Sequence, residues 1–261
     1  MIGKIVILGA GRLARHLAPA FTKKGYLISG IWNRSPEHGA ALARLVNTRF
    51  IKDLSELPDD ADLYLCIVSD SAIAEVAAGI PVHDRLIVHT SGSVSIDVLR
   101  PFSCEVGVFY PLQTFSNDAD VDLTRVPVCV ESASVKGMDT LLTLGQAISG
   151  HVLPVNSDDR RLLHLSAVMV SNFTNFLYTL ASDLLSENQL PSGILNELIL
   201  QTARNATLGH PGRFQTGPAI RNDKNVIENQ LKILSKYPDT REIYQLFTEN
   251  IVKYHSKHGQ L

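Results

Sequence analysis

The stretch KIVILGAGRLA, residues 4–14, decides the fold. An apolar, β-branched run leads directly into two glycines and then into an alanine-rich helical pattern. This is the order of a dinucleotide-binding turn, G-x-G-x-x-A, between a strand and a helix. Gly9 permits the tight turn, Gly11 lets the backbone approach a pyrophosphate, and Ala14 allows the helix to pack closely on the strand.

The helix that begins near Arg12 would present its free N–H groups and its positive dipole end to the phosphates. We therefore expect the cofactor to contact the residues of this turn, which are Gly9, Ala10, Gly11, Arg12 and Leu13. The alternative is a glycine-rich strand–helix turn in a sheet protein that binds no nucleotide.

The composition is that of an ordinary globular chain. Of 261 residues, 45% are hydrophobic and 19% are charged, and a net charge of −2 gives no general attraction to nucleic acid or to an anionic membrane. Three widely spaced cysteines indicate a reducing compartment, with neither a disulfide framework nor a thiolate-rich metal site. The chain enters a strand at once, so we expect no signal peptide, no metal and a cytoplasmic location.

Strand and helix patterns alternate up to residue 155, which predicts an α/β domain with a doubly wound parallel sheet of the Rossmann type. The expected strands are 4–8, 27–32, 49–51, 62–68, 86–89, 105–109, 126–130 and 151–155. From residue 156 the period changes to that of helices. We therefore predict a nucleotide-binding domain at 1–155 and an all-α domain for substrate binding and dimerisation at 156–261.

The end of the second strand indicates which nucleotide is preferred. An NAD site usually has an acidic residue there for the ribose 2′-hydroxyl, and the segment from Gly30 to Pro36 contains none. Asn33, Arg34 and Ser35 instead offer donors that suit a 2′-phosphate, which favours NADP. A solvated turn is the alternative.

The residues after later strands are further candidates, because ligands bind at the carboxyl ends of parallel strands. Ser69 and Asp70 flank the cofactor or simply cap a helix. In the segment HTSGS, His89 and Ser91 orient a carbonyl or imine or supply a proton, unless they only shape the loop. In YPLQTFS, the polar residues Gln113, Thr114 and Ser116 form one wall of a half-apolar pocket or belong to an aromatic turn.

Residues 162–182 contain no Asp, Glu, Lys or Arg, which predicts a helix buried in the all-α domain. At about 100° per residue, five polar residues fall within about 40° of one line along it: His164, Ser171, Asn175, Tyr178 and Ser182. This stripe indicates a site or a hydrogen-bonded seam between helices. In the later loop QTGPAIRND, Arg221 is a candidate for holding a substrate carboxylate, or it pairs with a surface acid.

The motifs GAGRLA, HTSGS, YPLQTF, HLSAVMVSNFTNFLY and QTGPAIRND together resemble a bacterial family of Rossmann-like NADP oxidoreductases with a C-terminal domain of unknown function. The family is related to pyrroline-5-carboxylate reductase and to deazaflavin-linked NADP reductases, and more distantly to 6-phosphogluconate and 3-hydroxyisobutyrate dehydrogenases. The resemblance covers essentially the whole chain. It implies a 6-phosphogluconate-dehydrogenase-like helical domain that helps to form a homodimer.

The sequence departs from the hydroxyacid dehydrogenases at one informative place. Those enzymes carry a catalytic lysine on the long helix and an asparagine four residues later. Here Val168 and Ser171 stand four residues before Asn172 and Asn175, and no lysine lies between Arg161 and Asp183. Lysine-assisted alcohol oxidation is therefore disfavoured, whereas imine reduction can proceed with hydroxyl groups and ordered water.

Two functions follow as hypotheses. The leading one is an NADP(H)-dependent oxidoreductase that transfers hydride between the nicotinamide and a small imine, oxo or hydroxy acid substrate in an interdomain cleft. Its expected substrate residues are His89, Ser91, Gln113, His164, Asn175 and Arg221, with a histidine as proton donor. The alternative is a non-catalytic NADP(H)-binding sensor or regulatory protein, and a structural dimer that binds no nucleotide is a third possibility.

Overall fold

The structure, a computed structural model, describes residues 3–116 and 121–257. Its contacts divide the chain after Phe173 into a unit built on a sheet and a unit built of helices. The boundary predicted after residue 155 follows the change in sequence pattern. The contacts instead group α5 (Ser157–Ala167), the first part of the long helical run, with the sheet.

The first unit contains an eight-stranded sheet with the order β3-β2-β1-β4-β5-β6-β7-β8. Its strands are β1 (Lys4–Leu8), β2 (Leu27–Trp32), β3 (Phe50–Ile51), β4 (Leu63–Cys66), β5 (Leu86–His89), β6 (Val106–Pro111), β7 (Val128–Ser132) and β8 (Val152–Pro154). The predicted Rossmann-type α/β fold is confirmed.

One strand pair departs from the predicted parallel sheet, because β7 runs antiparallel to β6 while the other neighbouring strands are parallel. A parallel return needs a crossover, usually through a helix. Between β6 and β7, the described residues contain only one short 3₁₀ turn, at Leu123–Arg125. The chain therefore returns beside β6 in the opposite direction.

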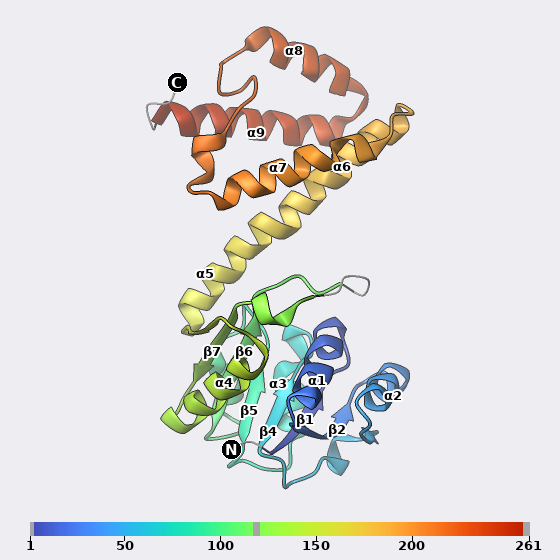
Figure 1. Ribbon diagram of the computed structural model, residues 1–261, viewed down its shortest axis with the longest axis vertical. Helices are drawn as coiled ribbons and strands as arrows, with labels where there is room; N and C mark the ends of the chain where they lie inside the picture. Colours follow the sequence, from blue (N-terminus) through green and yellow to red (C-terminus); the bar gives the residue numbers. More distant parts are fainter. Residues whose placement is uncertain (1–2, 117–120, 258–261) are drawn as a thin grey trace. The chain divides into compact units, whose positions relative to one another are not determined.

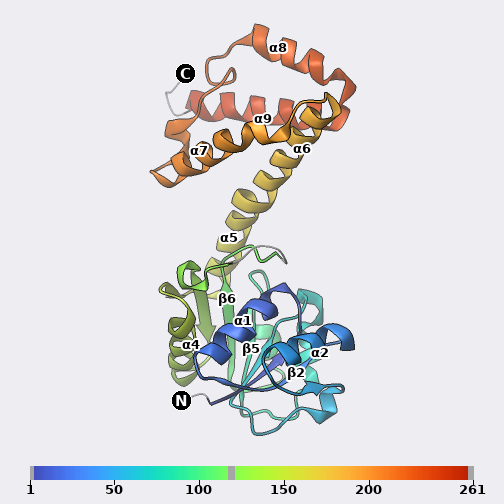
Figure 2. The same cartoon turned by 45° about the vertical axis from the view of Figure 1, so that its right-hand side comes forward.

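Helices cover both faces of the sheet (Figures 1 and 2). Ile5 and Ile7 of β1 point into a core shared with α1 (Arg12–Lys23), α2 (Pro36–Leu45) and α4 (Val135–Ile148). Val6 and Leu8 point into the opposite core, shared with α3 (Ile73–Ala78) and the 3₁₀ helix Ile96–Leu99. This alternation follows from the two-residue period of a strand, and burial on both faces explains why β1 is apolar throughout.

The second unit consists of α6 (Thr174–Glu187), α7 (Asn196–Thr207), α8 (Lys224–Ile233) and α9 (Pro238–Lys257), joined by turns. The expectation that residues 162–182 form a buried helix is wrong, because none of these residues is buried. Phe176 on α6 is 51% exposed and Leu198 on α7 is 65% exposed. No described helix has the length and apolar character needed to cross a membrane.

The long helical run is not a uniform α-helix. Between α5 and α6, residues Val168–Phe173 form a π-helical segment, in which each turn takes up more residues than in an α-helix. The predicted stripe assumed a constant 100° per residue, and that assumption fails across this segment. The alignment of Asn175, Tyr178 and Ser182 with His164 therefore stays a prediction.

A buried ion pair fastens α5 to the sheet. Arg160 is 1% exposed and pairs with Glu131 of β7. The same guanidinium donates to the backbone carbonyl of Val94 and, at 3.2 Å, to the hydroxyl of Ser157. Ser157 donates its N–H and its hydroxyl to Glu131 and accepts a hydrogen bond from the N–H of Ile96. The start of α5, strand β7 and the loop after β5 are thus joined in one network.

Replacing Arg160 with Met should lower the free energy of unfolding by about 3 kcal/mol, because it leaves the poorly exposed Glu131 without its counter-charge. The matched control is Arg161→Met, one position along the same helix, where the ion pair with Asp158 is exposed. The control should change stability by less than about 1 kcal/mol. Urea denaturation of both variants measures the difference, and equal effects would contradict the anchoring role of Arg160.

Candidate functional site

The glycine turn is built into the carboxyl edge of the sheet. Gly9 has φ +117°, and a Cβ added there would lie 2.0 Å from the carbonyl oxygen of Ile67. Only glycine therefore allows β1 to turn this close to the end of β4. Gly11 is the N-cap of α1 and provides no side-chain cap, and a Cβ added there would meet no atom within 4 Å. The space beside Gly11 is consequently open to a ligand.

Asn33 holds this turn in place. Its Oδ1 accepts a hydrogen bond from the Ala10 N–H at 2.9 Å, and its Nδ2 donates to the Ser35 carbonyl at 2.8 Å. Both amide atoms are thus used by the backbone. Arg34 and Ser35 are better placed to donate to a ligand, because Ser35 is the N-cap residue of α2 without a side-chain cap bond and Arg34 is exposed.

A groove of about 700 Å³ runs along this edge. That volume lies within the range of about 300–1,000 Å³ that is usual for small-molecule sites. Seven of the ten predicted cofactor residues line it: Gly11, Arg12, Leu13, Asn33, Arg34, Ser35 and Ser69. Gly9, Ala10 and Asp70 do not: Gly9 is packed against Ile67, Ala10 donates to Asn33, and Asp70 accepts a hydrogen bond from Ser93, so their contact with a cofactor stays a prediction.

The groove also has wall residues that the sequence analysis did not select, which are Trp32, His38, Ile67, Val68, Ala72, Glu75, Val76, Thr90 and Phe115. Thr90 directly follows β5, so a strict application of the strand-end rule would have found it. His38 lies in the first turn of α2, two residues beyond the segment that was considered. The ring of Phe115 packs against that of His16 on α1, at 5.2 Å between centroids, and no sequence signal indicates this contact.

The HTSGS loop is tied together by its own polar groups. His89 is fully buried, and its Nδ1 accepts a hydrogen bond from the Ser91 N–H at 3.1 Å. Burial, together with the positive charge of Arg160, lowers the pKa of His89 to about 4, so its ring is neutral near pH 7. The Ser91 hydroxyl accepts hydrogen bonds from the N–H groups of Ser93 and Val94.

Two hydrogen bonds join the YPLQTF segment to the long helix. The hydroxyl of Tyr110 lies 3.0 Å from Nδ1 of His164, and the two rings meet edge to face at an interplanar angle of 75°, with 5.9 Å between their centroids. The hydroxyls of Thr114 and Ser171 lie 2.8 Å apart. Thr114 belongs to the predicted pocket wall and Ser171 to the predicted polar stripe, whereas Tyr110 was quoted only as part of a sequence motif.

For the remaining predicted substrate residues, Gln113, Asn175 and Arg221, a role in substrate binding stays a prediction. Gln113 is exposed, its Oε1 accepts from the N–H of Thr114, and no hydrogen bond among the described residues joins it to His89 or His164. Asn175, on α6, and Arg221, in the turn before α8, are exposed and belong to the second unit.

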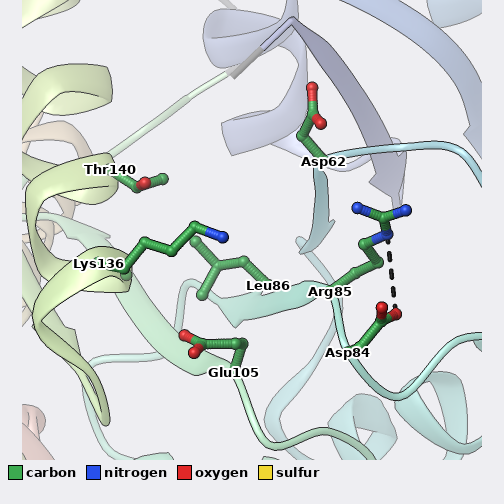
Figure 3. A pocket seen from close by; sticks show the side chains of 8 residues that line it. Asp62, Asp84, Arg85, Leu86, Glu105, Lys136 and Thr140 are labelled. Atoms are coloured by element: carbon green, nitrogen blue, oxygen red, sulfur yellow. Dashed lines mark ion pairs between the residues drawn. The ribbon is translucent and has the colours of Figure 1, made fainter. Parts of the chain in front are cut away.

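A smaller cavity of about 240 Å³ lies at the opposite edge of the sheet (Figure 3). Lys136 and Thr140 of α4 line it together with Glu105, and Arg85 pairs there with Asp84 at 3.7 Å. It opens where β4, β5 and β6 begin, whereas the glycine turn follows the end of β1. This cavity is therefore separate from the candidate cofactor site.

Both halves of the chain match family models. Residues 2–114 match a Rossmann-like domain, and residues 126–251 match a domain of unknown function (DUF2520). Among curated proteins, none matches the sequence.

Solved structures extend this similarity over almost the full length. A Bacteroides fragilis protein described as a "putative NADP oxidoreductase" is 38% identical, with a TM-score of 0.91 over 97% of this chain and 98% of that chain. An imine reductase from Myxococcus stipitatus in complex with NADP⁺ is 16% identical, with a TM-score of 0.67 over 98% and 95%. A pyrroline-5-carboxylate reductase from Coxiella burnetii is 14% identical, with a TM-score of 0.57 over 98% of each chain. The last two likenesses concern the fold.

The two glycines of the turn should respond differently to alanine. Gly9→Ala should lower the free energy of unfolding by more than about 2 kcal/mol, because the new Cβ overlaps a backbone carbonyl at a positive φ. Gly11→Ala places its Cβ in open space at φ −72° and should lose only about 1 kcal/mol, the difference expected at an N-cap. Thermal denaturation compares the two, and a Gly9→Ala variant as stable as Gly11→Ala would refute this account of the turn.

Proposed function

We propose that this chain, which belongs to the family that joins a Rossmann-like domain to a DUF2520 domain, is an NADP(H)-dependent oxidoreductase. Its reaction is the transfer of hydride between the nicotinamide and a small imine, oxo or hydroxy acid substrate. The observation that carries the proposal is the groove, in which an open glycine turn meets a basic segment at the end of β2.

The residues of the groove suit a dinucleotide phosphate. The N–H groups of the first turn of α1 have no partners within the helix, and the free space beside Gly11 lets a pyrophosphate approach them. Arg34, Ser35 and His38 line the groove together after β2, where an acidic residue would repel a 2′-phosphate. Val68, Ala72 and Val76 supply an apolar wall that suits an adenine ring.

The substrate end is assigned to the carboxyl edge near β5 and β6. A bound nicotinamide supplies the hydride from its C4 atom. The chain supplies orientation and a proton: Thr90 lines the groove after β5, and the Tyr110–His164 pair lies on the neighbouring strand and helix. Ser91 and His89 shape the loop that carries Thr90. Gln113, Asn175, Arg221 and an interdomain cleft remain predictions for substrate binding.

We further propose a homodimer through the helical unit. Among its described residues, only Ala219, Leu234 and His255 are buried, while α6 and α7 expose Phe176 and Leu198. A second copy of this chain, which presents the same apolar surface, is the partner that could cover both faces at once. Light scattering should give twice the monomer mass of 28.6 kDa, and a monomer at micromolar concentration would count against the proposal.

The cofactor is tested by titration of NADPH and NADH, followed by fluorescence. The wild type should bind NADPH at least 10-fold more tightly than NADH, and Arg34→Gln should remove most of that preference by deleting a cationic partner of the 2′-phosphate. Gly11→Ala should weaken both nucleotides at least 10-fold, because its methyl group fills the approach to the pyrophosphate. Arg44→Gln, at the far end of α2, is the matched control.

The reaction is tested by a turnover screen with NADPH against cyclic imines, oxo acids and deazaflavin. We expect oxidation of NADPH, seen as loss of absorbance, with at least one of these classes. The Gly11→Ala variant should be slower in proportion to its weakened binding. Tight NADPH binding with no turnover across the screen would instead favour the non-catalytic sensor.

A further inference from the structure

We propose that His164 is the proton donor of this reaction and that Tyr110 is the residue that positions it. The inference rests on the proposed function and assigns roles within the same site. It follows from three contacts of His164 or its helix: the 3.0 Å bond to Tyr110, the close packing over Gly92, and the anchoring of α5 by Arg160 one turn earlier.

The Tyr110–His164 pair is closely packed against the backbone at Gly92. A Cβ added to Gly92 would lie 2.6 Å from Nδ1 of His164 and 2.8 Å from Cζ of Tyr110. The imidazole therefore rests directly on the backbone of the HTSGS loop, two residues after Thr90, which lines the groove. Tyr110 is fixed in turn on β6, opposite Cys129 of β7. The ring of His164 is held from the strand side and from the loop side.

The bond to Tyr110 determines which nitrogen is available. Nδ1 faces the tyrosine hydroxyl, and Nε2 makes no hydrogen bond within the described residues, on a ring that is half-buried. Burial raises the pKa of Tyr110 to about 12, so its hydroxyl stays neutral and does not itself lose a proton near pH 7. Nε2 is thus the ring atom that can meet a substrate.

The charged groups around His164 are already paired or remote from it. On its own helix, Arg160 pairs with Glu131 of β7, and Arg161 pairs with Asp158. From the loops, Asp70 accepts a hydrogen bond from Ser93. The titratable neighbours on the sheet are Tyr110, Cys129 and the buried His89. His89 is excluded as the donor, because its low pKa leaves it neutral and its Nδ1 already accepts from Ser91.

As hydride reaches the imine or carbonyl carbon, the C=N or C=O π bond breaks, and its electron pair takes the Nε2 proton of imidazolium His164. The product is an amine or an alcohol. The neutral imidazole keeps its Nδ1 proton, which it donates to the Tyr110 oxygen throughout, and Nε2 takes a new proton from water. Tyr110 therefore orients the ring and does not transfer a proton.

The test uses the full-length protein with NADPH and the most active substrate of the screen. His164→Gln keeps a polar group beside Tyr110 but has no transferable acidic proton, so kcat should fall at least 100-fold with an unchanged Kd for NADPH. Wild-type reduction should slow as pH rises, because the donor must be protonated, and His164→Gln should lack this dependence. Tyr110→Phe and Gly92→Ala, which disturb only the position of the ring, should each lower kcat about 10-fold.

A double variant separates positioning from a general structural effect. If Tyr110 acts through His164, then Tyr110→Phe combined with His164→Gln should be no slower than His164→Gln alone. His151→Gln and Tyr26→Phe, at distant positions, are the matched controls and should retain the wild-type kcat.

Each outcome bears on the assignment. If the kcat losses of Tyr110→Phe and His164→Gln multiply in the double variant, Tyr110 does not act through His164, and its positioning role is overturned. A His164→Gln variant that keeps its kcat or its pH dependence would overturn the role of His164 and leave the proposed function intact. A wild type that binds NADPH but turns over no substrate would reject the proposed function and the proton donor together. If His164→Gln does not fold, an unchanged kcat in both Tyr110→Phe and Gly92→Ala would still overturn the proposal.

Discussion

The buried ion pair between Arg160 and Glu131 is the constraint on which the candidate site depends. Burying a guanidinium that is 1% exposed requires a counter-charge and hydrogen-bond acceptors, and Glu131, Ser157 and the Val94 carbonyl provide them for its two terminal nitrogens. These partners come from β7, from α5 and from the loop after β5. Their geometry fixes the start of α5 over the sheet edge. His164 lies four residues later, on the same side of the helix, and therefore reaches Tyr110.

The polar residues at the sheet edge divide into two groups by what their hydrogen bonds do. The Asn33 amide, the Ser91 hydroxyl and Nδ1 of His89 bond to backbone groups and give shape to the turns. Arg34, Ser35 and the Nε2 atom of His164 are left to meet a ligand. The first group fixes the positions of the second group, because a turn held by its own side chains presents neighbouring residues in one place. This division explains how a segment as short as HTSGS can contribute to the site mainly through its backbone.

The long helix has no lysine between Arg161 and Asp183, and its structure shows which polar residues stand there instead. In this chain the helix changes to a π-helical segment at Val168–Phe173, and the hydroxyl of Ser171 in that segment bonds to that of Thr114. Beyond the anchor at Arg160, His164 and Ser171 thus both make polar contacts with the sheet unit. A histidine beside a neutral tyrosine suits proton delivery to an imine or a carbonyl, which is the reduction proposed for this family member.

The sequence by itself determined the fold class, the position of the glycine turn and most of the residues that line the groove. These features rest on local rules: Gly9 must adopt a positive φ, the strands are apolar on both faces, and ligands bind where parallel strands end. Only the tertiary structure decided that β7 reverses, that Asn33 locks the turn, that Arg160 is buried, and that His164 rests on Gly92 against Tyr110. Those contacts join residues 23 to 72 positions apart in the chain, and the π-helical segment shifts the helix register between them. A helical or strand period specifies which face a residue occupies within its own element, but it does not specify which residue of a distant element that face will meet.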